Sequence, residues 1–145
     1  MPACGHAPNA RKTVQTMVRF MRHVMAMPTP WPSWVTGLLL LNLGAVAFVP
    51  RVEAWIVLGG LGLGAMLQMG IFARFGFVRL LGLGHFHWFA MVPWLLSRLD
   101  TIDDPLLYRW VGAVSVACGM SLVIDTVDVL RYLRGERAPA VALEG

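Results

Sequence analysis

Four apolar runs, each close to the length that crosses a bilayer, constrain this chain more than any other feature. A membrane-spanning helix needs about 20 predominantly apolar residues, and the sequence supplies such runs at 33–49, 54–73, 80–99 and 106–130. An open sheet in lipid would leave an unpaired edge, whereas a helix satisfies its own backbone hydrogen bonds. The sequence therefore predicts an all-α integral membrane protein with four antiparallel transmembrane helices.

The segments between the runs have the composition of turns. Residues 50–53 and 74–79 carry charges, and residues 100–105 form an acidic segment that ends in a proline. Proline suits the first turn of a helix, so Pro105 fits the start of the last span. The predicted organisation is a leader, a transmembrane domain and a flexible tail, over residues 1–32, 33–137 and 138–145.

Basic residues are distributed unevenly around the four runs. If the runs alternate in direction, nine of the twelve Lys and Arg residues fall on one side of the membrane: Arg11, Lys12, Arg19, Arg22, Arg74, Arg79, Arg131, Arg134 and Arg137. The other side receives Arg51, Arg98 and Arg109. Because positive charge marks the cytoplasmic side, both termini and the 74–79 loop are predicted to be cytoplasmic.

The composition agrees with a membrane location. Hydrophobic residues make up 57% of the 145 residues and charged residues 14%, against about 25% charged in soluble domains. The net charge of +4 comes from arginines scattered between apolar runs. That distribution suits lipid headgroups, and it lacks the solvated basic face that binds nucleic acid. Of the two cysteines, Cys4 lies in the polar leader, and Cys118 is expected to be a buried small side chain.

The leader contains its own helical pattern. Within 12–27, apolar residues recur at helical spacing while the cations occupy other faces, and no acidic residue precedes Glu53. This pattern is typical of an amphipathic helix that lies in the headgroup region. Three alternatives stay open: a flexible leader, a translation start at Met27, and an arginine-rich targeting segment.

Glycines recur on the predicted spans. The run GGLGLG at 59–64 lies inside an apolar span, so it is not the nucleotide-binding loop that follows a strand. In lipid, glycines allow the close approach of helix backbones. The predicted helix-packing positions are Gly60, Gly64, Gly82, Gly112 and Gly119.

Three spans carry a polar side chain at the same depth. Gln68, His85 and Asp125 each lie six residues from an arginine at the cytoplasmic end of their span, which is about 9 Å along a helix. Ionisable groups in a span face the bundle interior and usually find partners. Nearby arginines could neutralise the aspartates by reaching inward. The predicted buried polar cluster comprises Gln68, Arg74, Arg79, His85, Asp125 and Asp128.

No cofactor, metal or catalytic residue is predicted. His85 and His87 are two residues apart, so on a helix they point about 200° apart and cannot hold one ion together. A metal held by His85, Asp125 and Cys118 is chemically possible, but no spacing favours it. The serines lack the histidine partner that a nucleophile needs.

Two segments, RFGFVRLLGLGH (74–85) and DTVDVLRYLRGER (125–137), resemble parts of a family of small four-span inner-membrane proteins from proteobacteria. The resemblance covers roughly 27–137. It implies a multi-pass location in the bacterial cytoplasmic membrane, and it brings no activity with it. It also favours a start at Met27.

Two functions are the main candidates at this stage, and a membrane enzyme or redox carrier is a third class that stays open. The first is a non-enzymatic structural or accessory membrane protein that packs through its glycine-lined faces, either in a homo-oligomer or in a larger complex. The alternative is a small transporter or proton- or ion-conducting protein that uses Asp125 and His85.

Overall fold

Every regular element in the described part of the chain is helical, as the sequence predicts. The computed structural model describes residues 7–139, with side chains from residue 11 onwards. The first six residues of the predicted leader and most of the predicted tail lie outside this range. The α-helices are α1 (Ala7–Met25), α2 (Trp31–Leu43), α3 (Val52–Phe75), α4 (Trp88–Arg98) and α5 (Pro105–Leu133). The 3-10 helices are η1 (Gly44–Phe48), η2 (Arg79–His85) and η3 (Leu99–Thr101).

Three helical segments are long and apolar enough to cross a membrane: Trp31–Phe48, Val52–Phe75 and Pro105–Leu133. The first consists of α2 and η1, which follow each other without a break. All three present large apolar side chains on their outer faces. Leu40, Met66 and Val123 are 63%, 75% and 66% exposed. Apolar exposure on this scale is typical of a surface that another apolar phase covers.

The third apolar run differs from the single helix predicted over 80–99. It consists of the seven-residue 3-10 helix η2 and the eleven-residue helix α4. Gly82 and Gly84 each lower α-helix propensity by about 1 kcal/mol relative to alanine. The same glycines bring the backbone of η2 against its neighbours, so local propensity and tertiary packing both oppose a continuous α-helix here.

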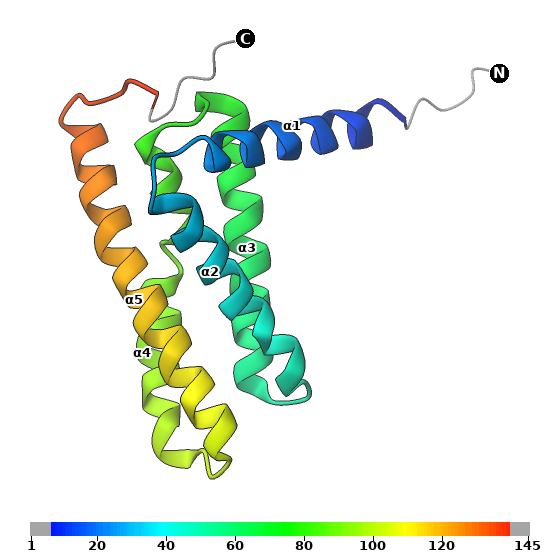
Figure 1. Ribbon diagram of the computed structural model, residues 1–145, viewed down its shortest axis with the longest axis vertical. Coiled ribbons are helices and arrows are strands. Elements are labelled where there is room, and N and C mark those ends of the chain that lie inside the picture. Colours follow the sequence, from blue (N-terminus) through cyan, green and yellow to red (C-terminus); the bar gives the residue numbers. More distant parts are fainter. Residues whose placement is uncertain (1–6, 140–145) are drawn as a thin grey trace.

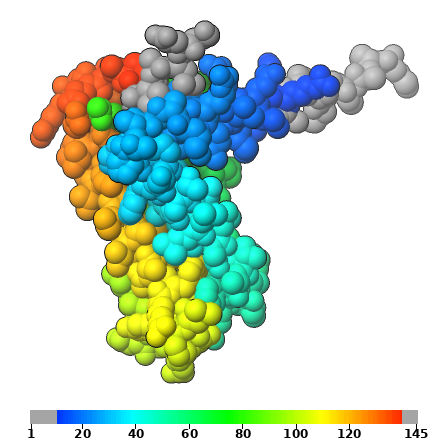
Figure 2. Space-filling view, in the orientation of Figure 1, coloured from blue at the N-terminus to red at the C-terminus, as the bar shows by residue number. Residues whose placement is uncertain are grey.

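The segments form an up-and-down bundle. α2, α3, the η2–α4 segment and α5 alternate in direction along one axis (Figure 1). α1 and the C-terminal end of α5 therefore lie at the same end of the bundle, called here the α1 end. The opposite end, where η3 leads from α4 towards α5, is called the η3 end. α1 crosses the bundle axis and projects beyond the other helices (Figures 1 and 2).

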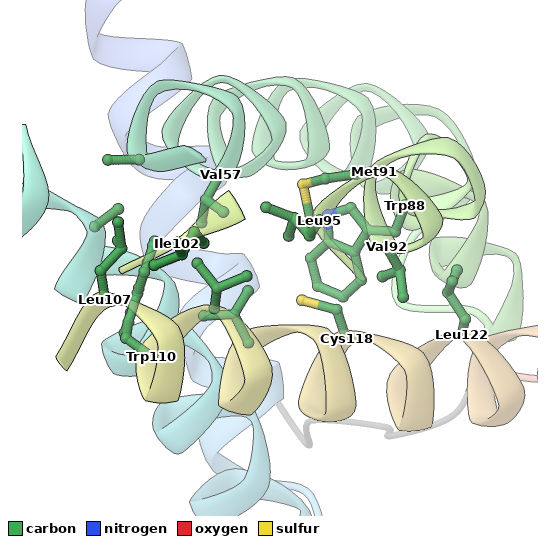
Figure 3. Packing of buried hydrophobic residues seen from close by; sticks show 14 residues of the cluster. Val57, Trp88, Met91, Val92, Leu95, Ile102, Leu107, Trp110, Cys118 and Leu122 are labelled. Carbon is green, nitrogen blue, oxygen red and sulfur yellow. The ribbon is translucent and has the colours of Figure 1, made fainter. Parts of the chain in front are cut away.

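An apolar core fills the space between the helices (Figure 3). Trp88 and Leu95 of α4 pack in it with Val57 of α3 and with Val114 and Cys118 of α5, all at most 2% exposed. In a lipid surrounding, such a core would stabilise the bundle by close packing more than by removal from water, because lipid is as apolar as these side chains. A second, smaller cluster joins α1 to α3 and η2, and consists of Val24, Phe72, Phe77 and Leu81.

Local signals set the ends of the long helices. The Asp104 carboxylate accepts hydrogen bonds from the backbone N–H groups of Leu106 and Leu107, at 2.9 and 3.3 Å, so it caps the start of α5. Gly76 follows α3 with a φ of 76°, a conformation that favours glycine and stops the helix.

Candidate functional site

η2 lies between α3 and α5 with almost no space on either side. A Cβ added at Gly82 would lie 2.9 Å from Asp125 Cβ and 3.1 Å from the Asp125 carbonyl oxygen. A Cβ added at Gly84 would overlap the Gln68 side chain and lie 3.3 Å from the Gly64 carbonyl oxygen. The two glycines therefore bring η2 close enough for its polar side chains to reach both helices.

His85, at the end of η2, connects α3 to α5. Its Nδ1 lies 2.8 Å from Asp125 Oδ2, and its Nε2 lies 3.2 Å from the Gln68 amide nitrogen. A carboxylate oxygen accepts and an amide nitrogen donates, so Nδ1 donates to Asp125 and the Gln68 amide donates to Nε2. Both ring nitrogens of His85 therefore have a partner. The ring stacks on Trp88 with the centroids 4.1 Å apart, which restricts its orientation.

Arg79, at the start of η2, belongs to a second group. Its guanidinium donates to Asp128 Oδ1 at 2.7 Å, and its Nε lies 3.6 Å from Glu136 Oε2. Arg131 donates to the same Glu136 oxygen at 2.8 Å. This hydrogen bond lowers the pKa of Glu136 below its ordinary value. Arg79 thus pairs with Asp128, and His85 pairs with Asp125.

Arg74 lies apart from the other members of the predicted cluster. Its guanidinium lies 5.8 Å from the centroid of the Phe75 ring. No carboxylate in residues 11–139 comes within ion-pair distance of it. Arg74 occupies the last turn of α3, where a long side chain extends towards the end of the bundle.

The predicted packing glycines divide into two sets. Gly60, Gly64 and Gly82 are close-contact positions, because a Cβ at any of them would lie within 3.4 Å of a neighbouring side chain or backbone atom. A Cβ at Gly112 or Gly119 would meet nothing within 4 Å among the described residues. Gly112 and Gly119 therefore make no close contact with the other described residues of the same chain.

His87, between η2 and α4, lies against the glycines of α3. Its ring lies 3.3 Å from the Cβ positions of Gly60 and Gly64. Both ring nitrogens are buried without a hydrogen-bond partner in the described range. The ring borders a groove between α3 and α4 that Trp55 and Trp94 also line.

The η3 end holds an ion pair that the sequence patterns did not single out. Glu53, in the first turn of α3, is 2% exposed, and its Oε1 accepts a hydrogen bond from Arg98 Nε at 3.2 Å. The sequence places both residues at span ends, where charges are normally solvated. Their predicted location on the same side of the membrane was the available signal for pairing.

Asn42 is a second polar residue that the patterns missed. It is 1% exposed, donates to the Leu38 carbonyl oxygen at 2.8 Å and lies 3.8 Å from Cys118 Sγ. A single amide within the run LLLLNL at 38–43 was the signal that could have identified it. With the bonds from Trp34 to Ser121 and from Trp110 to the Leu41 carbonyl, it joins α2 to α5.

These groups can bind and orient protons, and they form no complete metal site. No set of three His, Cys, Asp or Glu side chains in the described residues is arranged to hold a metal ion. Cys118 contacts Asn42 in the core, and His85 and Asp125 contact each other. The chemistry on hand is therefore hydrogen bonding and ion pairing between helices.

Comparison with known proteins identifies no relative: no family model, curated protein or solved structure matches this chain.

Proposed function

We propose that this protein is a non-enzymatic structural or accessory protein of a bacterial cytoplasmic membrane, which it crosses four times. The observation that carries the proposal is the separation of polar from apolar groups. The long helices turn large apolar side chains outward, whereas the acidic side chains between the helices pair with Arg79, His85 and Arg98. Such pairing fastens helices together, and the ring nitrogens of His87 are among the buried groups that stay without a hydrogen-bond partner in the described range.

The length of the η2–α4 segment supports a fourth crossing. Seven residues of 3-10 helix rise about 14 Å, and eleven residues of α-helix rise about 16 Å. Together they reach about 30 Å, the thickness of the hydrocarbon core. Phe89 and Leu96 of α4 are exposed like the outer faces of the longer helices, which suits contact with lipid.

The charges support an orientation with both termini in the cytoplasm. The α1 end carries the nine basic residues that the sequence assigns to one side, and the η3 end carries Arg51, Arg98 and Arg109. The positive-inside rule then places the α1 end in the cytoplasm.

Labelling of single cysteines tests the crossing and the orientation together. Variants at the exposed positions 75, 103 and 136 are treated in whole cells with a membrane-impermeant maleimide. We expect the cysteine at 103 to react from outside, and those at 75 and 136 to react only after permeabilisation. Reaction of the cysteines at 75 and 103 from the same side would contradict a crossing by the η2–α4 segment, and reaction of those at 103 and 136 from the same side would contradict a crossing by α5.

The pattern of hydrogen bonds favours a structural role over conduction through Asp125 and His85. A conducting path would continue from this pair towards the η3 end. Asn42, the buried amide in the middle of the core, bonds to Leu38 and Cys118 and not to the pair. Fully buried apolar side chains, among them Val111 and Val114, lie on α5 between the pair and the η3 end, and the buried Ser115 on the same stretch has no hydrogen-bond partner in the described range.

Proteoliposome flux distinguishes the two functions. If the protein is structural, purified protein moves no more protons or monovalent cations than empty vesicles, and Asp125→Asn changes stability alone. Flux that disappears in Asp125→Asn, with folding and oligomer size unchanged, would establish conduction instead.

An accessory protein also needs a surface for other helices. Gly112 and Gly119 on α5 face open space, and in lipid such positions suit close contact with another helix. Cross-linking in native membranes through cysteines at 116 and 120 should yield a defined homodimer or a defined adduct with a larger complex. Monomer alone at every cross-linker length would contradict this part of the proposal.

A further inference from the structure

α1 is attached to the bundle along one edge only. Phe20 packs edge-on against Phe72, with the ring centroids 5.4 Å apart, and His23 stacks on Phe77 at 5.3 Å. Val24, in the same part of α1, packs in a cluster with Phe72 and Phe77 and is 4% exposed. These contacts all lie in the C-terminal part of α1, so the rest of the helix projects beyond the bundle (Figures 1 and 2).

The projecting helix has an apolar face that the described residues of the chain leave uncovered. At about 100° per residue, five exposed apolar side chains fall within an arc of about 100°: Val14, Met17, Val18, Met21 and Met25. Met17, for example, is 54% exposed. A water-exposed face of this kind is costly, so it requires an apolar partner.

A basic face lies beside the apolar face. Arg11, Lys12, Arg19 and Arg22 fall within the adjoining arc of about 100°. α1 contains no acidic residue, and no carboxylate within residues 11–139 pairs with any of the four cations. The missing partner is therefore apolar on one side and anionic on the other.

The contacts of α1 define its level along the bundle. Phe72, against which it packs, lies three residues before the end of α3 at Phe75, which is about 4.5 Å along the helix. Interfacial helices lie at this level, with their apolar faces 5–10 Å into the boundary between headgroups and acyl chains.

We propose that α1 docks on anionic phospholipid headgroups of the cytoplasmic leaflet, with its exposed apolar face among the acyl chains. This inference rests on the proposed crossing of the membrane, because the crossing puts α1 at the surface of the same bilayer. The basic face then lies towards the phosphates. A lipid occupant also explains why α1 runs across the bundle axis, since a helix in the interface lies in the plane of the membrane.

Hydrogen exchange of the full chain in nanodiscs tests the inference without labels. Discs of phosphatidylcholine alone are compared with discs that also contain phosphatidylglycerol. Each cation near an anionic surface contributes about fivefold to binding. We therefore expect amides over 11–19 to exchange more than about tenfold more slowly in the anionic discs. High salt should remove most of this protection.

Two variants identify the source of the protection. R11E/K12E/R19E/R22E should exchange equally in both kinds of disc, whereas R51E/R109E, with two exposed cations reversed at the η3 end, should behave like the parent. V14Q/M17Q/V18Q should lose protection in both discs. Equal exchange of the parent in the two discs would overturn the inference and favour a protein partner for α1.

The same data separate this inference from the proposed function. Amides of α3 and α5 report the crossing, because lipid protects them whatever its charge. If the amides of α3 and α5 are protected from exchange and those of α1 exchange equally in the two kinds of disc, the lipid docking alone is overturned. Free exchange in the outward-facing stretches of α3 and α5 would overturn the crossing, and the docking with it.

Discussion

The two ends of the bundle hold their buried charges in different ways. At the η3 end, the Glu53 side chain is 3% exposed, and Arg98 is its ion-pair partner. At the α1 end, the carboxylates of Asp125 and Asp128 are 22% and 34% exposed. Each of these two side chains has its own partner, so the α1 end holds its charges in two groups that the rest of the bundle covers only partly.

The difference decides how each end should respond to a lost partner. A carboxylate that is almost wholly buried and singly paired becomes an uncompensated buried charge when that partner is removed. A partly exposed carboxylate recovers some of the loss from water. The α1 end depends instead on close packing, because η2 has to fit between α3 and α5 before any polar contact forms.

We expect the largest effect at the η3 end. Arg98→Met should lower the free energy of unfolding by about 3 kcal/mol, because it leaves Glu53 buried without its partner. The measurement is an unfolding titration of the protein in detergent micelles, and Arg51→Met, an exposed arginine at the same end, is the control.

The double variant R98M/E53Q should recover most of the stability, because it also removes the buried charge. An Arg98→Met protein as stable as the parent would show that the two ends respond alike.

The next largest loss of stability is expected from a change in packing at the α1 end. Gly82→Ala should cost about 1–3 kcal/mol, because its Cβ would press on the backbone of Asp125. Gly62→Ala is the matched control: it adds the same atom in open space on α3, and better helix propensity should make it neutral or stabilising by up to about 1 kcal/mol. Equal stability of the two variants would mean that η2 has room to move.

The hydrogen bond between His85 and Asp125 should couple these residues by about 1 kcal/mol in a double-mutant cycle. His85→Phe keeps the ring that stacks on Trp88 and removes the nitrogens, and Asp125→Ala removes the acceptor. Effects on unfolding that simply add would show that the 2.8 Å contact contributes nothing.

The smallest effect should come from the partly exposed ion pair between Arg79 and Asp128. Arg79→Gln and Asp128→Asn should each cost about 0.2–1 kcal/mol, less at high salt, and the two changes should be non-additive. Arg79→Gln with Asp125→Asn should add within about 0.5 kcal/mol, because Arg79 bonds to Asp128 instead. Strong coupling of Arg79 to Asp125 would reassign the pairing.

Much of the α1 end could be anticipated by counting residues. Equal offsets from the terminal arginines put Gln68, His85 and Asp125 at one depth, and the structure brings the three into one hydrogen-bonded group. The offset for His85 assumed an α-helix. η2 rises about 2.0 Å per residue instead of 1.5 Å, which puts His85 about 3 Å deeper than the estimate.

The rest depended on contacts between residues far apart in the sequence. Counting placed Arg74 and Arg79 equally close to the aspartates, and only the position of η2 against α5 selects Arg79 for Asp128. Glu53 looked like part of a turn because periodicity carries no information about which residue of another helix covers it.

The order of apolar and charged residues by itself determined the helical class, the approximate ends of the long apolar segments and the concentration of cations at one end, because these depend on length and solvent preference along the chain. The tertiary structure alone decided the winding of η2, the partners of Arg79, His85 and Glu53, and the uncovered faces of α1 and α5. Those features depend on which surfaces meet in three dimensions, where a single methyl group at Gly82 or Gly84 would prevent the contact.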